Sequence, residues 1–542
     1  MSAYYPTPSH NTDVRFGKSI VLVAILLLII PALLVRVPPL LDYPNHYVRL
    51  WLIAGGVNLP PLSQMYAFSW SGAWTNIAID LIAWVLGGLV PVTVIGPLVL
   101  MLAITLRPLG IMMLGQSLFG TARWWHVLCF ILAWNWALIA GFINFEISLG
   151  LALLSAALDV RLARHGAGVL VPLRIIAGAT TLVAHPFGYL FYAALISGLA
   201  LGPSFIALRS LQGLRQAFVR IVLACLPITV PAIILILFAP ALPGGNTAHH
   251  AIVWQQPTIS AHISILLTGI KTYRFSVDAI FGVLLASPIF LALILHRLRF
   301  HAGLLIITIV LTIGSLLMPQ LFFGAAGVDT RLPCMVALCL GVAVLPDFGF
   351  SRRGAAVATA LAMLVVAGRT AWIGHVWLAR QSDFASLERV LKHIPAGASV
   401  LPMEHLPAAA QIRQAPIGRF LGGINPLFWH EPTLAIMDRH AFVPNLFTAA
   451  GEQPIRVLPP WNDISAAAGP IEPVNQLGNP DLLTAPYLGR WHECFDYILV
   501  VNADMPNAKG PLPQSPAIVP VADEGFARLY KITHDSQTKA CH

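Results

Sequence analysis

Apolar runs long enough to cross a lipid bilayer recur through the first 372 residues, and they constrain the fold more than any other feature. A spanning helix needs about 20 predominantly apolar residues. The chain of 542 residues is 57% hydrophobic and 10% charged, against about 25% charged for soluble domains. These values favour a polytopic membrane protein over one large soluble core. The predicted spanning runs are 19–35, 75–92, 124–142, 145–160, 172–186, 187–206, 218–239, 276–295, 302–318, 332–348 and 354–372.

Basic residues between these runs predict the direction of the crossings. Lys and Arg concentrate on the cytoplasmic side of membrane proteins, and this rule places the N-terminus inside. Segment 93–118 is apolar but interrupted by Pro97 and Arg107-Pro108, which leaves one helix, two helices or an interfacial segment open. The C-terminal segment is then external, which requires an odd number of crossings, 11 or 13. Segments 36–74 and 240–275 are the predicted external loops.

The net charge of +9 is unevenly distributed along the chain. Residues 1–372 carry 20 Lys and Arg against 8 Asp and Glu, whereas residues 373–542 carry 12 against 15. The excess therefore belongs to the membrane part, where it is explained by topology and by contact with lipid headgroups. It does not indicate nucleic-acid binding. The six cysteines show no metal-binding spacing and predict no disulfide framework, with Cys494 and Cys541 as the one pairing left open.

Composition changes near Ala371, after which charged residues, Pro and Gly become frequent. We therefore divide the chain into a transmembrane domain at 1–372 and an extracytoplasmic domain at 373–542. Helical spacing of apolar residues predicts a helix over Phe384–Ile394. Runs rich in aromatic and β-branched residues predict strands. These predicted strands are Ala398–Pro402, Phe495–Val501 and Phe526–Ile532. A helix followed by separated strands indicates a small α/β domain.

The stretch Asp42-Tyr43-Pro44-Asn45-His46, just after the first apolar run, carries the strongest chemical signal. Asp42 is one of only eight acidic residues in the first 372, and a carboxylate is costly in so apolar a bundle. Asp42 and His46 are candidates for a general base or for ligands of one divalent ion, Mg²⁺ or Mn²⁺. The competing interpretation is a helix-capping Asp with a stacked His. Pro44 leaves a helix and a turn open, and Arg49 is placed to neutralise Asp42.

Other polar residues on the predicted outer side are few. Glu146 lies at a tight turn, with a helix cap as its alternative role. His185 lies at another outer turn, where a lone histidine more often has a structural role than a functional one. Arg274 and Arg331 are candidates for phosphate binding, with snorkelling to lipid headgroups as the alternative. The tandem pair His249-His250 is weak evidence for a metal. The remaining candidates in these outer segments are Lys271 and Asp329.

This layout resembles the GT-C superfamily of membrane glycosyltransferases. The resemblance covers the whole chain as architecture: an internal N-terminus, one helix, a long external loop with an acidic motif, a polytopic bundle and an external α/β domain. As motif it rests on Asp42-Tyr43-Pro44-Asn45-His46 and on Asp329-Thr330-Arg331-Leu332-Pro333. The final strand, Phe526-Ala527-Arg528-Leu529-Tyr530, also looks like those of bacterial GT-C-like proteins.

The resemblance implies an enzyme that transfers a hexose or pentose from a polyprenyl-phosphate carrier to an extracytoplasmic glycan, lipid or protein. It implies a bacterial inner membrane, with the C-terminal domain in the periplasm. Asp42 would be the base or a metal ligand, His46 would assist it, and Arg331, then Arg274, Lys271 and Arg49, would bind the lipid phosphate. Glu146, His185 and Asp329 would support the site. The chain departs from the common pattern in having Asp with His in place of paired acids.

Two functions of other classes stay open from the sequence. One is a non-catalytic GT-C-like subunit or scaffold of an envelope or polysaccharide complex, which the missing second acid favours. The other is a transporter of lipid-linked glycans, which predicts internal repeats and charged residues at mid-membrane. Neither feature stands out in the sequence, so transport ranks last of the three.

Overall fold

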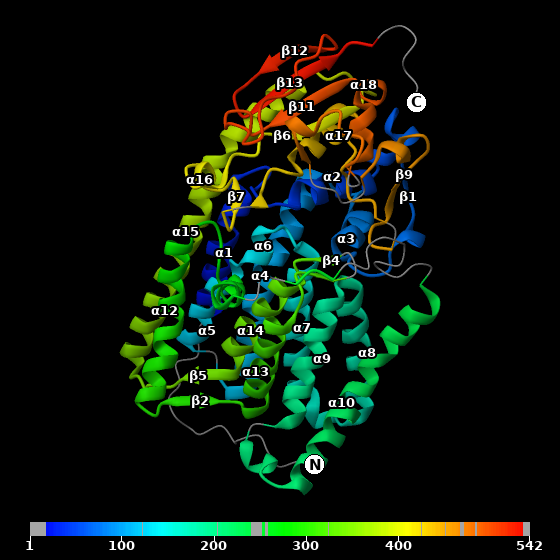
Figure 1. Ribbon diagram of the computed structural model, residues 1–542. Helices are drawn as coiled ribbons and strands as arrows, with labels where there is room; N and C mark the ends of the chain where they lie inside the picture. Colours follow the sequence, from blue (N-terminus) through cyan, green and yellow to red (C-terminus); the bar gives the residue numbers. More distant parts are fainter. Residues whose placement is uncertain are drawn as a thin grey trace. The chain divides into compact units, whose positions relative to one another are not determined.

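The computed structural model describes residues 18–121, 123–202, 204–239, 252–254, 258–322, 325–423, 425–449, 451–466, 471–482 and 485–534 (Figure 1). The chain forms two compact units. The first comprises residues 1–33, 100–138 and 143–374, and the second comprises 34–99, 139–142 and 375–542. The predicted pair His249-His250 lies outside the described residues, as does Cys541.

The first unit is built almost entirely of helices, and its few strands are very short. The helices α1, α4, α6 and α15 continue into the second unit. The helices are α1 (Lys18–Leu34), α4 (Val92–Phe119), α5 (Trp124–Leu128), η4 (Cys129–Ala133), α6 (Trp136–Ile139), α7 (Ile143–Leu162), η5 (Ala163–His165), α8 (Ala167–Ala184), α9 (Pro186–Leu201), η6 (Phe205–Leu208), α10 (Leu211–Phe238), α11 (Ile259–Leu266), η7 (Leu267–Gly269), α12 (Phe275–Ile294), α13 (Ala302–Leu317), α14 (Val328–Ala343) and α15 (Arg352–Leu391). The strands are β2 (Leu298–Phe300), β3 (Leu321–Phe322), β4 (Ala325–Ala326) and β5 (Val344–Pro346).

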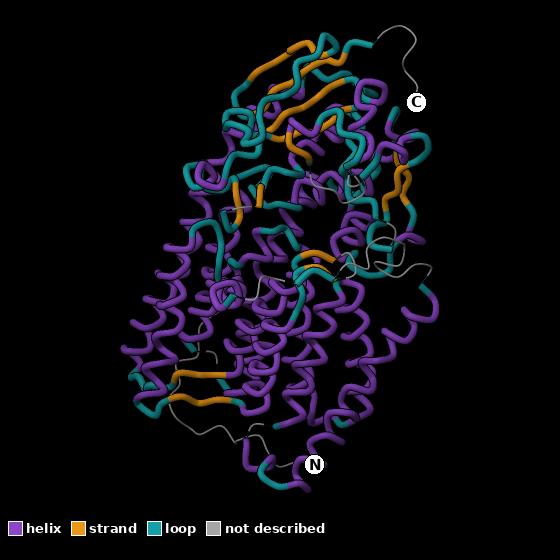
Figure 2. The backbone as a smooth tube through the Cα atoms, in the orientation of Figure 1, coloured by secondary structure: helices purple, strands orange, loops and turns teal. Residues whose placement is uncertain are grey.

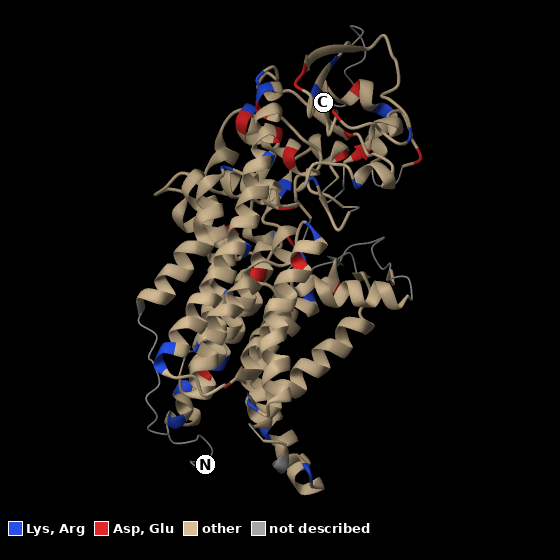
Figure 3. Cartoon of the chain, turned by 90° about the vertical axis from the view of Figure 1, so that its left-hand side faces the viewer, with Lys and Arg blue, Asp and Glu red and all other residues tan. Residues whose placement is uncertain are grey.

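Six helices in the described part of the chain are long and apolar enough to cross a membrane, and they indicate a membrane protein. They are α4, α7 with its 3₁₀ extension, α8, α10, α12 and α15. Figure 3 shows how few charged residues these long helices carry. Segment 93–118 is thus one helix, α4, in spite of its prolines. Five further apolar helices have 10–17 residues, so a count of 11 or 13 crossings stays a prediction.

The predicted spanning run 124–142 is not one continuous helix. It is divided into α5, the 3₁₀ helix η4 and the four-residue helix α6, with an extended residue at Trp134. The side chain of Asn135 accepts a hydrogen bond from the Leu138 N–H at 2.9 Å. Such a local side-chain acceptor competes with the helical pattern, which hydropathy alone does not register.

Small residues let the helices of the first unit approach closely. A Cβ atom added to Gly303 in α13 would lie 2.0 Å from the carbonyl oxygen of Gly198 in α9. A Cβ atom on Gly150 in α7 would lie 2.4 Å from Leu106 Cβ in α4. Close backbone contact at small residues is a common way to pack helices within a membrane. The pairs α9–α13 and α4–α7 are packed by such close contacts.

The helix α15 runs without interruption over 40 residues. The predicted helix Phe384–Ile394 exists for most of its length, but it is the last part of α15 and does not begin a new element. The change of composition near Ala371 therefore does not end the helix. A helix can continue from an apolar into a polar environment because all its backbone hydrogen bonds are internal.

The second unit contains a five-stranded mixed sheet, drawn in orange in Figure 2. Its strand order is β10-β6-β11-β13-β12. The first three strands are mutually parallel, and β13 pairs antiparallel with both β11 and β12. All three strands that the sequence predicts in this region are confirmed within two residues. The strands are β6 (Val400–Glu404), β10 (Glu472–Pro473), β11 (Tyr497–Val501), β12 (Ile518–Asp523) and β13 (Ala527–Ile532).

The predicted external loop 36–74 contributes secondary structure to this second unit. Its strand β1 (Tyr66–Phe68) pairs antiparallel with β9 (Ile455–Val457). Its helix α2 (Tyr43–Ile53) packs against α17 (Leu434–Arg439) and α3 (Ala78–Leu86). The remaining short elements of the unit are η1 (Gly56–Asn58), η2 (Leu62–Gln64), η3 (Trp70–Gly72), α16 (Ala409–Ile412), β7 (Phe420–Leu421), β8 (Asn425–Pro426), η8 (Glu431–Thr433), η9 (Trp461–Ile464), η10 (Val474–Gln476), η11 (Pro486–Arg490) and α18 (Trp491–Cys494).

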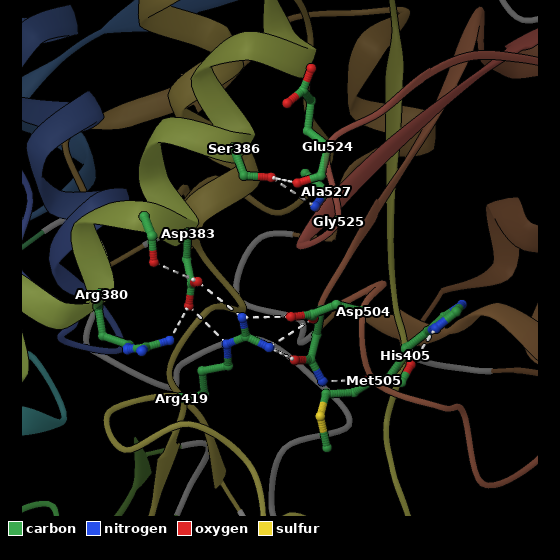
Figure 4. Close-up of polar contacts among 12 residues, drawn as sticks. Arg380, Asp383, Ser386, His405, Arg419, Asp504, Met505, Glu524, Gly525 and Ala527 are labelled. Atoms are coloured by element: carbon green, nitrogen blue, oxygen red, sulfur yellow. Dashed lines mark hydrogen bonds and ion pairs between the residues drawn. The ribbon is translucent and has the colours of Figure 1, made fainter.

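A buried arginine ties the end of α15 to the loops around the sheet (Figure 4). Arg419 donates to both carboxylate oxygens of Asp383 at 2.8 and 2.9 Å and to both of Asp504 at 2.7 and 2.8 Å. Bidentate pairing of this kind favours one orientation of the partners. Elsewhere in the unit, Cys494 forms a disulfide.

Candidate functional site

Asp42 and His46 lie at the start of α2. Asp42 is the N-cap residue, and the His46 N–H donates to the Asp42 carbonyl oxygen at 3.0 Å. Pro44 occupies the first turn, where proline is tolerated because the N–H groups there have no intrahelical acceptor. Of the two alternatives left by the sequence, the structure thus has the helix. The two residues are one turn apart and lie on one side of it.

The sequence does not predict the third residue of this site, His430. Its Nε2 atom lies 3.6 Å from Asp42 Oδ1. It directly precedes η8 and lies 385 residues beyond Asn45. The packing of η8 and α17 against α2 brings it here. No spacing in the sequence connects two residues so far apart, and a single imidazole in a polar domain carries no distinctive signal.

Asn45 determines which nitrogen of His430 carries the proton. The backbone N–H of Phe447 donates to Asn45 Oδ1 at 2.9 Å, and Asn45 Nδ2 donates to the Asn445 carbonyl oxygen at 2.9 Å. Together these bonds fix the orientation of the amide. Asn45 Nδ2 is also 3.2 Å from His430 Nδ1, so that ring nitrogen is the acceptor. A neutral ring then carries its proton on Nε2, the atom that faces Asp42.

Both histidines are held in the neutral form. Burial lowers the pKa of His430 to about 3. Burial, with the nearby Arg49 and His430, lowers the pKa of His46 well below its ordinary value. The Asp42 side chain is 16% exposed, whereas that of His430 is 6% exposed. The site therefore presents one reachable carboxylate beside a neutral imidazole donor.

An aromatic ring separates the two histidines. Phe447 contacts His46 at a centroid distance of 5.5 Å and His430 at 4.7 Å, in both cases edge to face. Among the described residues, His46 Nδ1 is buried and has no hydrogen-bond partner. The backbone of Gly141 interacts with the same ring.

Gly141 allows the close approach of residues 139–142 to the start of α2. The Asp42 N–H donates to the Ala140 carbonyl oxygen at 3.2 Å. Gly141 has φ of +86°, and an added Cβ would lie 2.6 Å from the Asp42 backbone nitrogen. Both the backbone conformation and the lack of space favour glycine at this position.

Arg49 pairs with Asp80 and not with Asp42, contrary to the suggestion from the sequence. Its Nε lies 2.7 Å from Asp80 Oδ1 and its Nη2 lies 3.1 Å from Asp80 Oδ2. Both side chains are fully buried. A charge with a bidentate partner at this depth is well explained by structure, so binding of a donor phosphate is not needed to account for Arg49.

The remaining predicted site residues belong to the first unit. Glu146 lies in the first turn of α7, and its Oε2 is 2.7 Å from Arg107 Nε, with both side chains fully buried. Arg107 also donates to the carbonyl oxygens of Ala103, Leu132 and Ala133. Glu146 thus neutralises an arginine that ties α4 to the η4 segment.

Arg331 and His185 are neighbours in the first unit. The guanidinium carbon of Arg331, in the first turn of α14, lies 5.4 Å from the centre of the Phe187 ring. His185 caps α9, since its Nδ1 accepts from the Phe187 N–H at 3.1 Å. Asp329 is fully buried, and its Oδ1 accepts from the Thr330 N–H at 2.9 Å. These contacts bring three predicted residues close to the beginnings of α9 and α14.

Lys271 and Arg274 lie just before and at the N-cap of α12. Lys271 is half-buried and Arg274 is exposed. Asp278 in the same segment accepts from Thr272 Oγ1 at 2.6 Å and pairs with Arg369 at 2.5 Å. The carboxylate is therefore already neutralised by Arg369, and this end of α12 carries excess positive charge.

The divalent ion predicted at Asp42 and His46 was compared with the groups of potential ligands in the structure. In the described part of the chain, no three His, Cys, Asp or Glu side chains come together in a way that could hold a metal ion. Asp42 and His430 are neighbours, with His430 Nε2 at 3.6 Å from Asp42 Oδ1. Binding of a divalent ion by Asp42 and His46 stays a prediction, and the chemistry below uses only the protein's own groups.

The chain was compared with family models and with curated proteins, and neither comparison produced a match. The site therefore has to be interpreted from its own geometry. A partly exposed carboxylate, next to a neutral imidazole and surrounded by buried side chains, can accept a proton from a bound hydroxyl.

Proposed function

We propose that the protein is a GT-C-type glycosyltransferase of the bacterial inner membrane, which moves a sugar from a polyprenyl-phosphate carrier to an extracytoplasmic acceptor. The observation that carries the proposal is the Asp42–His430 pair. A base needs to be reachable, and Asp42 is; it also needs a donor that orients it, and in the proposed mechanism the Nε2–H group of His430 takes this role as the two groups approach each other. The distance of 3.6 Å is longer than a hydrogen bond, as is frequent in ligand-free catalytic sites.

In the proposed reaction, Asp42 removes the proton of an acceptor hydroxyl. The acceptor oxygen forms a bond with the anomeric carbon of the donor sugar as the bond from that carbon to the phosphate oxygen breaks. The electron pair of the broken bond leaves with the lipid phosphate, and the sugar configuration inverts. A guanidinium near the leaving phosphate stabilises the transition state more than the ground state. Arg331 is the first choice for this role and Arg274 the second.

Two further observations support the proposal. Arg331 is only 9% exposed, and its guanidinium group lies over the ring of Phe187. An arginine stays charged when buried, and the face of an aromatic ring attracts that charge. The disulfide of Cys494 fits a domain on the oxidising side of a bacterial inner membrane. That location agrees with the orientation expected from the basic residues between the apolar runs.

The proposal is tested with the full-length protein in nanodiscs and polyprenyl-phosphate-linked radiolabelled hexoses and pentoses. Release of polyprenyl phosphate is measured in the presence of membrane extract as the source of acceptors. Asp42→Asn should lower the rate about 10²–10⁴-fold, the usual contribution of a general base. The matched control is Asp463→Asn, which changes an exposed carboxylate of the same unit.

His430→Gln separates an orienting role from a purely structural one. It should lower the rate less than Asp42→Asn and change the dependence of the rate on pH, because the carboxylate loses the imidazole N–H donor that faces it. Equal rates for wild type and Asp42→Asn would refute the proposed mechanism. A folded protein with no transfer from any of these donors would favour the non-catalytic subunit instead.

A further inference from the structure

An apolar cavity of about 230 Å³ lies inside the first unit, between α12, α14, η7 and the α5–η4 segment. It is lined by side chains such as Leu132, Ile270 and Ile289. The one indole in its wall, that of Trp125, donates its Nε1–H to the Gly341 carbonyl oxygen at 3.0 Å. The wall therefore presents an apolar surface to a bound molecule, and the indole N–H of Trp125 is not available to it as a donor. Typical pockets for small molecules measure about 300–1,000 Å³, so this cavity suits a part of a ligand.

Small residues on both long helices create the cavity. They include Gly282 and Ala286 on α12 and Ala337 and Gly341 on α14. A Cβ atom on Gly282 would lie 2.6 Å from Ile270 Cδ1, so even one methyl group would crowd this end. At 1.5 Å per residue, the lining positions extend roughly 10–12 Å along the two helices. A narrow apolar space of this length has the shape of a hydrocarbon chain.

The helix α12 is directed mainly toward the hydrocarbon of the membrane. Only 11% of its most apolar window is buried. Side chains next to the lining positions are widely exposed, with 60% for Ile280, 65% for Val283 and 66% for Phe290. The cavity thus adjoins a face of the protein that lipid covers, and the surrounding membrane is the natural source of its occupant.

Positive charge stands at one end of the cavity. Ile270 lines it, Lys271 follows directly, and Arg274 is at the start of α12. Asp278 is paired with Arg369, whereas Lys271 and Arg274 form no ion pair with the described residues. Burial lowers the pKa of Lys271 in spite of the opposing effect of Asp278, and a further anion beside it would offset the remaining cost of burial. The charge pattern therefore suits an anionic headgroup.

We propose that this cavity holds one acyl chain of an anionic phospholipid whose phosphate lies against Lys271 and Arg274. The chain would fill the space between α12 and α14, and the headgroup would supply the negative charge that this end lacks. The lipid would link two helices that leave a void between them. The inference concerns the first unit alone and does not depend on the proposed transfer reaction.

The first test uses the unaltered full-length protein. After removal of lipid in detergent, the protein is titrated with phosphatidylglycerol or phosphatidylcholine, and bound lipid is counted by native mass spectrometry. One phosphatidylglycerol should remain bound at detergent concentrations that remove phosphatidylcholine, and it should raise the unfolding temperature. Equal retention of both lipids would overturn the assignment of an anionic headgroup.

Variants then locate the bound lipid. Ala286→Phe fills the cavity and should abolish retention of phosphatidylglycerol, whereas Ala360→Phe, on an exposed position of α15, should retain it. Lys271→Gln should reduce the preference for phosphatidylglycerol about fivefold, the equivalent of ~1 kcal/mol for a basic residue near an anionic lipid. Unchanged retention in Ala286→Phe would overturn the proposal. Retention of polyprenyl phosphate in place of phosphatidylglycerol would overturn the assignment to a phospholipid.

Discussion

The amide nitrogen of Asn45 lies 3.2 Å from His430 Nδ1, although the two residues are 385 positions apart in the chain. This contact fixes the ring so that its other nitrogen faces Asp42. The chemistry of Asp42 therefore depends on an amide in its own helix and on an imidazole from the C-terminal part of the second unit.

Replacement of Asn45 should weaken the fold as well as the site. Asn45→Ala would leave the Phe447 N–H and the Asn445 carbonyl oxygen without their partner. A buried polar group that loses its partner costs about 1–3 kcal/mol. The unfolding temperature in detergent should fall clearly, while Asn462→Ala, at an exposed position, should leave it unchanged. Equal values for the two variants would contradict the proposed network.

His430 should make the protein less stable in acid. Its pKa is lowered to about 3 by burial, below the ordinary value near 6.5. The stabilisation from its neutral form is complete above pH 6.5 and is lost as pH falls toward 3, because the unfolded chain binds the proton first. This group alone should lower the free energy of unfolding by about 2 kcal/mol between pH 8 and pH 5.

The measurement compares unfolding midpoints of wild type and His430→Gln at pH 8 and pH 5. The variant should lose part of the acid sensitivity. His492→Gln, at a histidine whose side chain is 49% exposed, serves as the matched control and should behave as wild type. Identical pH dependence in all three proteins would show that His430 titrates freely.

Glu404 should act in the opposite direction. Burial, with the nearby Glu472, raises its pKa to about 8, although Trp429 donates to its Oε2 at 3.0 Å. The stabilisation from its protonated form is complete below the unfolded pKa near 4.3 and is lost as pH rises toward 8. Glu404→Gln, which keeps an acceptor for the indole, should therefore raise the unfolding midpoint at pH 8 and have little effect at pH 4. A lower midpoint for this variant at pH 8 would argue that the carboxylate is charged and stabilised.

The Arg49–Asp80 pair predicts a difference between single and double variants. Removal of one partner from a buried ion pair costs about 3–5 kcal/mol, whereas apolar replacement of both is often nearly neutral. Arg49→Met and Asp80→Leu should each destabilise the second unit, and the double variant should recover most of the loss. Transfer activity in the recovered double variant would show that Arg49 is structural. Loss of activity in a fully stable double variant would restore a role in phosphate binding.

Local patterns predicted the features that depend on neighbours in the chain. The strands β6, β11 and β13 were predictable because each lies in a short run that is rich in apolar, aromatic or β-branched residues. The break at Trp134 and the uninterrupted course of α15 were not. The former depends on an Asn135 side chain that bonds a nearby backbone N–H, and the latter on a helix that tolerates a change of environment.

The candidate site likewise has some features that the sequence predicts and others that it does not. The rarity of Asp42 in an apolar chain and its place four residues before His46 were visible in the residues themselves. Its partner His430 and the pairing of Arg49 with Asp80 were not, because each depends on which distant segments pack against α2.

By itself, the sequence determined that the protein has long apolar helices suited to a membrane, followed by a region with a β-sheet. Hydropathy and periodicity are sums over adjacent residues, so they are present before any folding. Only the tertiary structure decided that residues 34–99 join the C-terminal residues in one compact unit. This association depends on buried contacts between distant residues, such as the hydrogen bond from Asn45 to Asn445, and patterns of neighbouring residues do not predict such contacts.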